Sequence, residues 1–447
     1  GDSGLVEPSA PACDRVLAPR GHRPVRGAGP GELVVGAGEA RRAAPAPLWD
    51  AISIVAQAAI AQFNAQDLAS TSWAFSALAR RDAALLDAIS AASRARLRSS
   101  EVFFQPQQLA NLAWSFSRLA CSDSPLFEVI AAASLRRIRQ FRPSELANLA
   151  WSFAKLAVLH AALMDGISSA ALLRLGEFGP KDLSSTAWAC ARLEIQDAAL
   201  REAIAAASVR SILEFEAQAL SNTAWAFARL RAAPGPLMLG IAPAATARGS
   251  QLGAQELAIT AWALATLEVR HLPFLARASL RFREQVRPGI NEQQPRALVG
   301  TAWAFAALSY RDWPLFASIS SEAWRMIGQF SAQDAAATAW AVAARRVRDC
   351  PLLQGLAAAA IARQDAARGL EPRHLATTAW SFAVLRCSDR PLLHGMSAGA
   401  LQTVAEFGPP DIAMTAWSFA VLDMLDAPLL DTIWTRAAAR LSEFEAQ

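Results

Sequence analysis

The stretch LANLAWSFAKL, residues 146–156, decides the fold of this chain. Nine other stretches match it, which gives ten copies of one motif, each centred on a tryptophan. In chain order these are Trp73, Trp114, Trp151, Trp188, Trp225, Trp262, Trp303, Trp340, Trp380 and Trp417. Successive tryptophans lie 37 to 41 residues apart. A fixed period in this range predicts a solenoid, in which stacked repeats share one continuous core.

Each repeat is predicted to hold two helices, here named helix A and helix B. In copy three, Leu146, Leu149 and Phe153 follow the helical period and mark the buried side of helix A. Pro-Leu opens helix B in six copies, and a first helical turn tolerates proline. The expected fold class is therefore all-α, an α-solenoid of about ten helix-turn-helix repeats with about 21 helices. We expect the superhelix to be right-handed.

The domain organisation follows from the period. Residues 1–46 are rich in Gly, Pro, Ala and Arg, which is typical of a disordered arm. The solenoid is expected over residues 47–447, with a half repeat at 47–63 and ten repeats beginning near residues 66, 107, 144, 181, 218, 255, 296, 333, 373 and 410. Because the array begins and ends in the middle of a repeat, we expect the sequence to be a piece of a longer protein.

Composition excludes little. The net charge of +4 permits a nucleic-acid partner but does not argue for one. No apolar run approaches the length of a membrane span, so no membrane contact is expected. The cysteine number is odd and no CxxC pair occurs, which predicts neither a disulfide framework nor a zinc site and fits a reducing compartment. The five are Cys13, Cys121, Cys190, Cys350 and Cys387.

Catalysis is poorly supported. No histidine pairs with a Cys, an Asp or a second His at the spacing of a metal site or catalytic triad. His374 takes a helix-capping position that other copies fill with Asp, and His160 lies in a turn between helices A and B, so both are expected at the surface. Neither a Gly-rich phosphate loop nor a hydrolase motif occurs. We therefore predict no catalytic residue, no metal, no cofactor and no enzyme.

The tryptophans are interpreted as a packing seam. Small residues lie four positions before and three positions after each of them, apart from Val299 before Trp303, so the indoles can lie flat against the next helix A. Stacking on nucleic-acid bases is the less favoured alternative.

A candidate binding face lies beside the tryptophans. Positions Trp−3, Trp+1 and Trp+4 fall on one side of helix A, away from the Leu/Phe stripe. In copies two to five they carry amides, hydroxyls and cations: Asn111, Ser115, Arg118, Asn148, Ser152, Lys155, Ser185, Arg192, Asn222 and Arg229. Cations at repeat spacing can follow a phosphate backbone, and Asn or Ser can reach base edges. The pattern favours single-stranded RNA over the alternative, an ordinary solvated face.

Copies six to ten differ at the same positions, which are uncharged and mostly apolar there. This part of the face is expected to bind a protein partner, or else to consist of decayed repeats. A second arginine column lies 22 or 23 residues after the tryptophans, where it is expected to complement the negative end of helix B. It comprises Arg96, Arg137, Arg174, Arg210, Arg248, Arg325, Arg363 and Arg440.

The motif L-[AS]-[NS]-[TL]-A-W-[AS]-[FL]-A-x-L resembles the octotricopeptide repeat over residues 47–447. With the related repeats of FAST-kinase-like proteins and of trypanosome RNA-editing substrate-binding complexes, that family is associated with RNA binding in mitochondria and chloroplasts. The resemblance implies a solenoid whose helices A face RNA, acting in the stability, processing, editing or translation of organellar transcripts. Two departures limit it: nothing matches the RAP domain that ends many relatives, and only copies two to five keep the polar face.

Three hypotheses follow. The first is a non-catalytic, single-stranded RNA-binding protein of the mitochondrion or chloroplast. The second is a protein-interaction scaffold of the armadillo or HEAT type. The third and weakest is a targeting array for an enzyme domain that the sequence does not contain.

Overall fold

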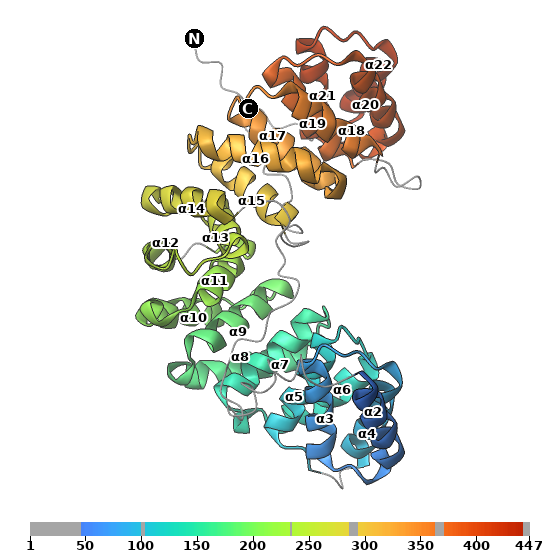
Figure 1. Ribbon diagram of the computed structural model, residues 1–447, viewed down its shortest axis with the longest axis vertical. Coiled ribbons are helices and arrows are strands. Elements are labelled where there is room, and N and C mark those ends of the chain that lie inside the picture. Colours follow the sequence, from blue (N-terminus) through green and yellow to red (C-terminus); the bar gives the residue numbers. More distant parts are fainter. Residues whose placement is uncertain (1–45, 100–102, 233–234, 286–293, 363–370, 441–447) are drawn as a thin grey trace. The chain divides into compact units, whose positions relative to one another are not determined.

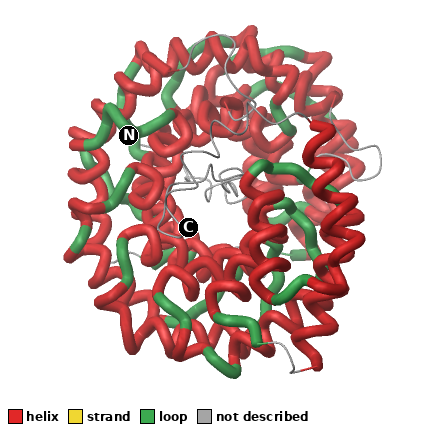
Figure 2. Tube along the Cα trace, turned by 60° about the horizontal axis from the view of Figure 1, so that its bottom comes forward, coloured by secondary structure: helices red, strands yellow, loops and turns green. Residues whose placement is uncertain are grey.

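The computed structural model describes residues 46–99, 103–232, 235–285, 294–362 and 371–440. Within these residues it has 21 α-helices joined by short loops and no strand (Figure 2). The expected all-α solenoid of helical repeats is therefore confirmed, while its handedness stays a prediction. The expected N-terminal arm lies outside the described residues except for Ala46, and so do residues 441–447. None of the described helices is both long and apolar enough to cross a bilayer.

Helices A and B alternate along the chain, preceded by a single helix, α2 (Ala46–Ala59). The helices A are α3 (Ala65–Ala77), α5 (Pro106–Arg118), α7 (Pro143–Lys155), α9 (Pro180–Arg192), α11 (Ala217–Arg229), α13 (Ala254–Thr266), α15 (Gln294–Ala307), α17 (Ala332–Ala344), α19 (Pro372–Leu385) and α21 (Pro409–Val421). The helices B are α4 (Ala83–Ser99), α6 (Ser124–Leu135), α8 (Ala161–Arg174), α10 (Ala198–Arg210), α12 (Gly235–Ala247), α14 (Leu272–Gln285), α16 (Trp313–Met326), α18 (Cys350–Ala362), α20 (Arg390–Thr403) and α22 (Ala427–Ala439).

The chain divides into two compact units, an N-terminal unit that ends at Ile241 and a C-terminal unit that begins at Ala242. In the N-terminal unit, α3, α5, α7, α9 and α11 pack on one another in chain order (Figure 1). In the C-terminal unit, α13, α15, α17, α19 and α21 do the same. Successive helices B pack less closely, as a second layer.

Small residues around each tryptophan allow the helices A to approach closely. The tryptophan rings then meet in a row: the centroids of Trp151 and Trp188 are 6.1 Å apart, and those of Trp188 and Trp225 are 6.2 Å apart. In the C-terminal unit, Trp262 and Trp303 lie 6.5 Å apart. Trp188 and Trp225 are each only 2% exposed. The packing seam is thus confirmed for the buried tryptophans of the column, Trp151, Trp188, Trp225, Trp262, Trp303 and Trp380, whereas Trp417 is 39% exposed.

The starts of the helices A follow the expected capping chemistry. The Glu145 carboxylate accepts a hydrogen bond from the backbone N–H of Arg142 at 2.8 Å, and Asp182 accepts one from Gly179 at 3.2 Å. These bonds occupy backbone donors that a helix start leaves without partners.

The ends of the helices A share a feature that the sequence did not suggest. The residue at Trp+6 has a left-handed backbone in all ten copies, yet none is glycine: Ala79, Ala120, Ala157, Glu194, Arg231, Glu268, Ser309, Arg346, Arg386 and Asp423. In copy three, the N–H of Val158 donates to the carbonyl of Phe153 at 2.9 Å. That bond closes the helix in the manner of a Schellman motif.

In the nine copies whose Trp+9 residue the structure describes, that residue caps helix B, and in five of them it also joins two repeats. Asp82 accepts the Leu85 N–H at 3.1 Å and the hydroxyl of Ser53, from the preceding helix B, at 2.5 Å. The Ser53 hydrogen bond is the main cause that lowers the pKa of Asp82. The same Ser–Asp bond joins Ser397 to Asp426 at 2.6 Å. Elsewhere in the column the pairs are Ser90–Asp123, Ser168–Asp197 and Ser279–Asp312.

Two copies replace that aspartate by histidine. His160 Nδ1 accepts the Leu163 N–H, and His271 Nδ1 accepts the Phe274 N–H, both at 3.1 Å. His160 is therefore a half-buried cap rather than a free surface residue.

Members of the second arginine column, such as Arg174 and Arg440, also join repeats. Arg174 Nη1 donates to the carbonyl of Phe141 at 2.9 Å, and Arg440 Nη1 donates to the carbonyl of Phe407 at 2.7 Å. Both carbonyls belong to the preceding repeat. The cation thus binds carbonyl groups at the end of a helix B, as expected, but that helix belongs to the preceding repeat. Arg363 lies outside the described residues.

Two further expectations were wrong. His374, expected at the surface, is 8% exposed because α19 packs between its neighbours α17 and α21, and burial lowers its pKa. Cys350 and Cys387, expected to be unpaired, form a disulfide with Cα atoms 5.8 Å apart. Their separation of 37 residues matches the repeat length, so stacking places them side by side.

Candidate nucleic-acid interface

The Trp−3 column retains a row of polar side chains at the edge of the helix-A layer. Asn111, Asn148 and Ser185 are half-buried, so part of each residue is open to solvent. Asn222 continues the column, but it is only 7% exposed. Because α5, α7, α9 and α11 pack in order, these four residues follow one another from repeat to repeat.

The Trp+1 column is not part of an exposed face, contrary to expectation. Ser115 and Ser152 are fully buried. Ser115 Oγ donates to the carbonyl of Asn111 at 2.7 Å, and Ser152 Oγ donates to the carbonyl of Asn148 at 2.6 Å. Their hydroxyls are therefore used inside the helix, four residues back. Their place is the close contact between successive helices A, where only a small residue fits.

The Trp+4 column places two of its four cations against the tryptophan of the same helix. The Arg118 guanidinium carbon lies 5.2 Å from the centroid of Trp114, and Lys155 Nζ lies 6.0 Å from that of Trp151. Both side chains are half-buried. The indole face attracts and orients the cation. The positive charge is thus held next to the polar Trp−3 column.

The other two cations differ from each other. Arg192 is exposed, and among the described residues it forms no ion pair. Arg229 Nη2 lies 2.7 Å from Glu194 Oε1 of the preceding repeat, so part of its charge is neutralised. The net positive charge at Trp+4 is therefore larger in copies two to four than in copy five.

Copies six to ten offer less apolar surface than expected for a protein-binding face. At Trp−3, Ile259, Ala337 and Thr377 are all buried. At Trp+4, Ala307 and Val421 are exposed. The apolar strip is therefore discontinuous in this half of the chain.

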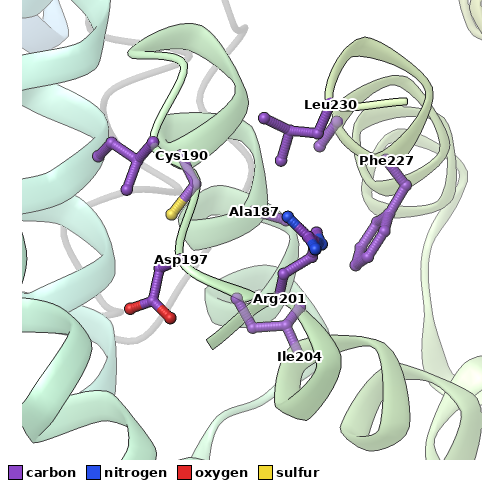
Figure 3. Close-up of a pocket in the computed structure, with 9 residues that line it drawn as sticks. Ala187, Cys190, Asp197, Arg201, Ile204, Phe227 and Leu230 are labelled. Atoms are coloured by element: carbon purple, nitrogen blue, oxygen red, sulfur yellow. The ribbon is translucent and has the colours of Figure 1, made fainter. Parts of the chain in front are cut away.

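A small cavity lies behind the helix-A layer, between α9, α10 and α11 (Figure 3). Cys190 lines it at Trp+2, where most other copies place phenylalanine, such as Phe153 and Phe227. The cavity, about 10 Å³, is the space that the smaller side chain leaves. Burial raises the pKa of the Cys190 thiol to about 12, so the thiol is protonated at neutral pH and is a weak nucleophile. Within the described residues, no group of three or more His, Cys, Asp or Glu side chains could hold a metal ion.

Sequence reasoning missed a second group of cations, in the turns between helices A and B of copies seven to nine. They lie between Trp+5 and Trp+10 and comprise Arg311, Arg345, Arg346, Arg348, Arg386 and Arg390. The signal was visible at Trp+8, where Arg270, Arg311 and Arg348 follow one another in consecutive copies. It was overlooked because only helix A was searched for columns.

Comparison with known proteins gives one family. The model described as RNA-editing substrate-binding complex 6 protein matches residues 48–312 and 211–447, two overlapping stretches that together cover the repeat array. No curated protein matches the chain.

Proposed function

Because the chain belongs to the family of RNA-editing substrate-binding complex 6 proteins, we propose that it is a non-catalytic protein that binds single-stranded RNA. Its role is in editing or a related step of transcript processing, stability or translation, in a mitochondrion or chloroplast. The resemblance of its repeats to octotricopeptide and FAST-kinase-like repeats supports the same proposal.

The observation that carries this proposal is the alignment of two columns on consecutive helices A. Asn111, Asn148 and Ser185 form the polar column, and Arg118, Lys155 and Arg192 form the cationic one, in copies two to four. Repeat proteins that read single-stranded RNA use one helical repeat per base, with two or three side chains of each repeat contacting that base. Ser115 and Ser152 are left out of the proposal because they are buried. Arg229 extends the cationic column into copy five, whereas Asn222 is left out because it is buried as well.

The two columns have different tasks in this proposal. Arg118, Lys155 and Arg192 neutralise phosphates, which supplies affinity that does not depend on sequence. Asn111 and Asn148 present amides that both donate and accept, so they can discriminate base edges. Loss of a cation should therefore weaken binding to all sequences, whereas loss of an amide should change preference.

The test is a variant in which Arg118, Lys155, Arg192 and Arg229 are all changed to Ala. We expect its affinity for a random single-stranded RNA pool to fall at least about tenfold at physiological salt. The slope of log K against log salt should fall by roughly 2 to 3, at about 0.7 per phosphate contact, with Arg229 contributing less because Glu194 already pairs with it. Fluorescence anisotropy at several salt concentrations measures both.

A matched control removes the same charges elsewhere in the N-terminal unit. Arg136, Arg139, Arg210 and Lys181 are exposed and likewise comprise three arginines and one lysine. Changed to Ala, they should leave the salt slope nearly unaltered. An unchanged slope in the first variant, or an equal loss in the control, would exclude this face as the RNA-binding site.

A second candidate function is a protein-interaction scaffold. It is favoured by large apolar side chains that stand exposed on the helices B, among them Leu173 in α8 and Trp434 in α22. This candidate would replace the first if the purified protein ignored RNA pools and retained a defined protein partner.

A further inference from the structure

The turns of copies seven to nine hold an arginine cluster that packing does not explain. We call it the arginine rim, and it consists of Arg311, Arg345, Arg346, Arg348, Arg386 and Arg390. All except Arg345 are exposed. Among the described residues, none of the six forms an ion pair with a carboxylate. In the neighbouring copies the same turn carries acidic residues, Glu268 beside Arg270 in copy six and Asp423 in copy ten.

The three turns that carry the rim lie beside one another. Helices α15, α17 and α19 pack in order, and α16, α18 and α20 do the same (Figure 1). The Cys350–Cys387 disulfide fixes the turn of copy nine to the start of α18. Since Arg348 lies two residues before Cys350 and Arg386 directly before Cys387, this link holds cations of two repeats near each other.

The aspartates of the same turns do not neutralise the rim. Asp312 accepts the hydroxyl of Ser279 at 2.5 Å and the Leu315 N–H at 2.9 Å. Asp349 and Asp389 each accept one N–H of the helix they begin, both at 3.1 Å. Their carboxylates are thus occupied as helix caps, and arginines outnumber them two to one.

Arg345 is the residue least compatible with a purely structural role. It stands at Trp+5, where the other nine copies have leucine. Its Nε is buried without a hydrogen-bond partner among the described residues. Burial lowers the pKa of the Arg345 guanidinium, and the charge of Arg311 in the preceding repeat lowers it further. A cation placed next to another cation, with a donor left unused, is an arrangement that a bound anion would complete.

An aromatic side chain completes the pattern. Trp313, two residues after Arg311 at the start of α16, is 58% exposed. Guanidinium groups match the geometry of phosphate, and an exposed indole offers a stacking surface for a base. An acidic peptide would use the arginines but would have no comparable use for the indole.

We propose that the arginine rim binds the phosphate backbone of a single-stranded RNA, with Trp313 stacking on one of its bases. The rim is a second binding site, separate from the columns of copies two to five. The inference rests on the proposed RNA-binding function and adds a location that the helix-A face does not include. Spacing of roughly 8 to 10 Å between packed helices lets successive turns contact successive stretches of one strand.

The test measures binding of a fluorescent single-stranded RNA pool to the full chain at several salt concentrations. In a rim variant, Arg311, Arg346 and Arg348 are changed to Gln. We expect its salt slope to fall by about 2, because three phosphate contacts are lost at about 0.7 each. Trp313→Ala should lower affinity by about tenfold and leave the salt slope unchanged, because stacking releases no counterions.

Matched controls come from the same unit. Arg277, Arg325 and Arg373 are exposed and lie outside the rim, so changing them to Gln removes the same number of cations, two of which already pair with Glu322 and Glu371. Trp434→Ala removes another exposed tryptophan. Both controls should bind as the parent does. Circular dichroism melts of all variants show whether a loss of binding reflects unfolding.

The outcomes separate the two proposals. A parental affinity and slope in the rim variant, with a loss in the copies two-to-five variant, would overturn the rim and leave the RNA-binding function standing. No RNA binding by the parent chain would remove both. If poly-glutamate displaced RNA from the rim and Trp313→Ala bound normally, the rim would be a docking surface for an acidic protein and the inference would be wrong.

Discussion

His374 carries a pH dependence that follows from its burial. Other copies place a carboxylate, an alanine or, in copy two, Gln108 at this position. His374 lies inside α19, with Nε2 3.9 Å from Glu371 Oε2. Arg373 and Asp334 also face it. Burial is the largest influence and lowers its pKa below the ordinary value of 6.5. The folded protein therefore holds this imidazole neutral where the unfolded chain would protonate it.

We expect the free energy of unfolding to fall as pH is lowered below about 6.5. The unfolded state then binds a proton that the folded state excludes, and stability decreases wherever the unfolded state binds more protons and the pH drops. His374→Gln should make this pH dependence shallower. His394→Gln, which changes an exposed histidine, should not. Urea unfolding between pH 7 and pH 5 measures both slopes, and equal slopes for parent and His374→Gln would contradict the prediction.

Single residues show where prediction from sequence succeeded and where it stopped. The Leu/Phe stripe and the tryptophan seam were predictable because burial recurs with the helical period and the repeat. Ser115 and Ser152 were not, because a helical wheel gives the direction of a side chain but not how far the neighbouring helices cover it. A helix A inside an array is covered from both sides. Only a narrow strip stays partly open, at Trp+4 and, in copies two to four, at Trp−3.

Among the elements, the helix-A terminus offers an opportunity for stabilisation. Ala157 adopts φ of 56°, a conformation that costs a non-glycine residue about 1 kcal/mol or more. Glycine is the usual residue at such a helix end, and its absence from all ten copies explains why the exact end was not predictable. The repeat keeps the Schellman geometry through its hydrogen bonds alone.

Ala157→Gly should therefore stabilise the protein by roughly 1 kcal/mol, because glycine adopts this conformation without strain. Ala132→Gly is the control, since Ala132 is exposed in the interior of α6 and its replacement should destabilise by about 1 kcal/mol. Opposite shifts of the denaturation midpoint are expected. A decrease for both variants would show that the left-handed residue carries no strain.

At the scale of the whole molecule, the disulfide should act locally. A solenoid repeat contacts only its neighbours, so a link between copies eight and nine stabilises that region and little else. The cysteine spacing appeared uninformative in the linear sequence, but it equals one repeat, and stacking converts that separation into contact. Cysteine pairs in an array are therefore better judged by repeat position than by sequence distance.

Cys350→Ser should destabilise the region around α17 to α20 by about 2 to 4 kcal/mol, as expected for opening a loop of this length. Hydrogen exchange should rise there and stay unchanged in α3 to α9. Cys121→Ser, at a free cysteine, is the control. A uniform rise along the chain would contradict a local effect.

The contacts between repeats also have a direction. The carbonyls at the end of one helix B are satisfied by an arginine of the following repeat, as Phe141 is by Arg174. The Ser53 hydroxyl likewise donates to Asp82 of the following repeat. During synthesis on a ribosome, the last repeat to emerge would therefore lack the arginine and the aspartate that bond to it until the following repeat emerged. Deletion of N-terminal repeats leaves an arginine donor without its carbonyl, and water can hydrate that donor. Deletion of C-terminal repeats leaves a buried carbonyl without its donor, which costs more free energy. Shortened versions of the protein should therefore tolerate N-terminal deletions better than C-terminal ones.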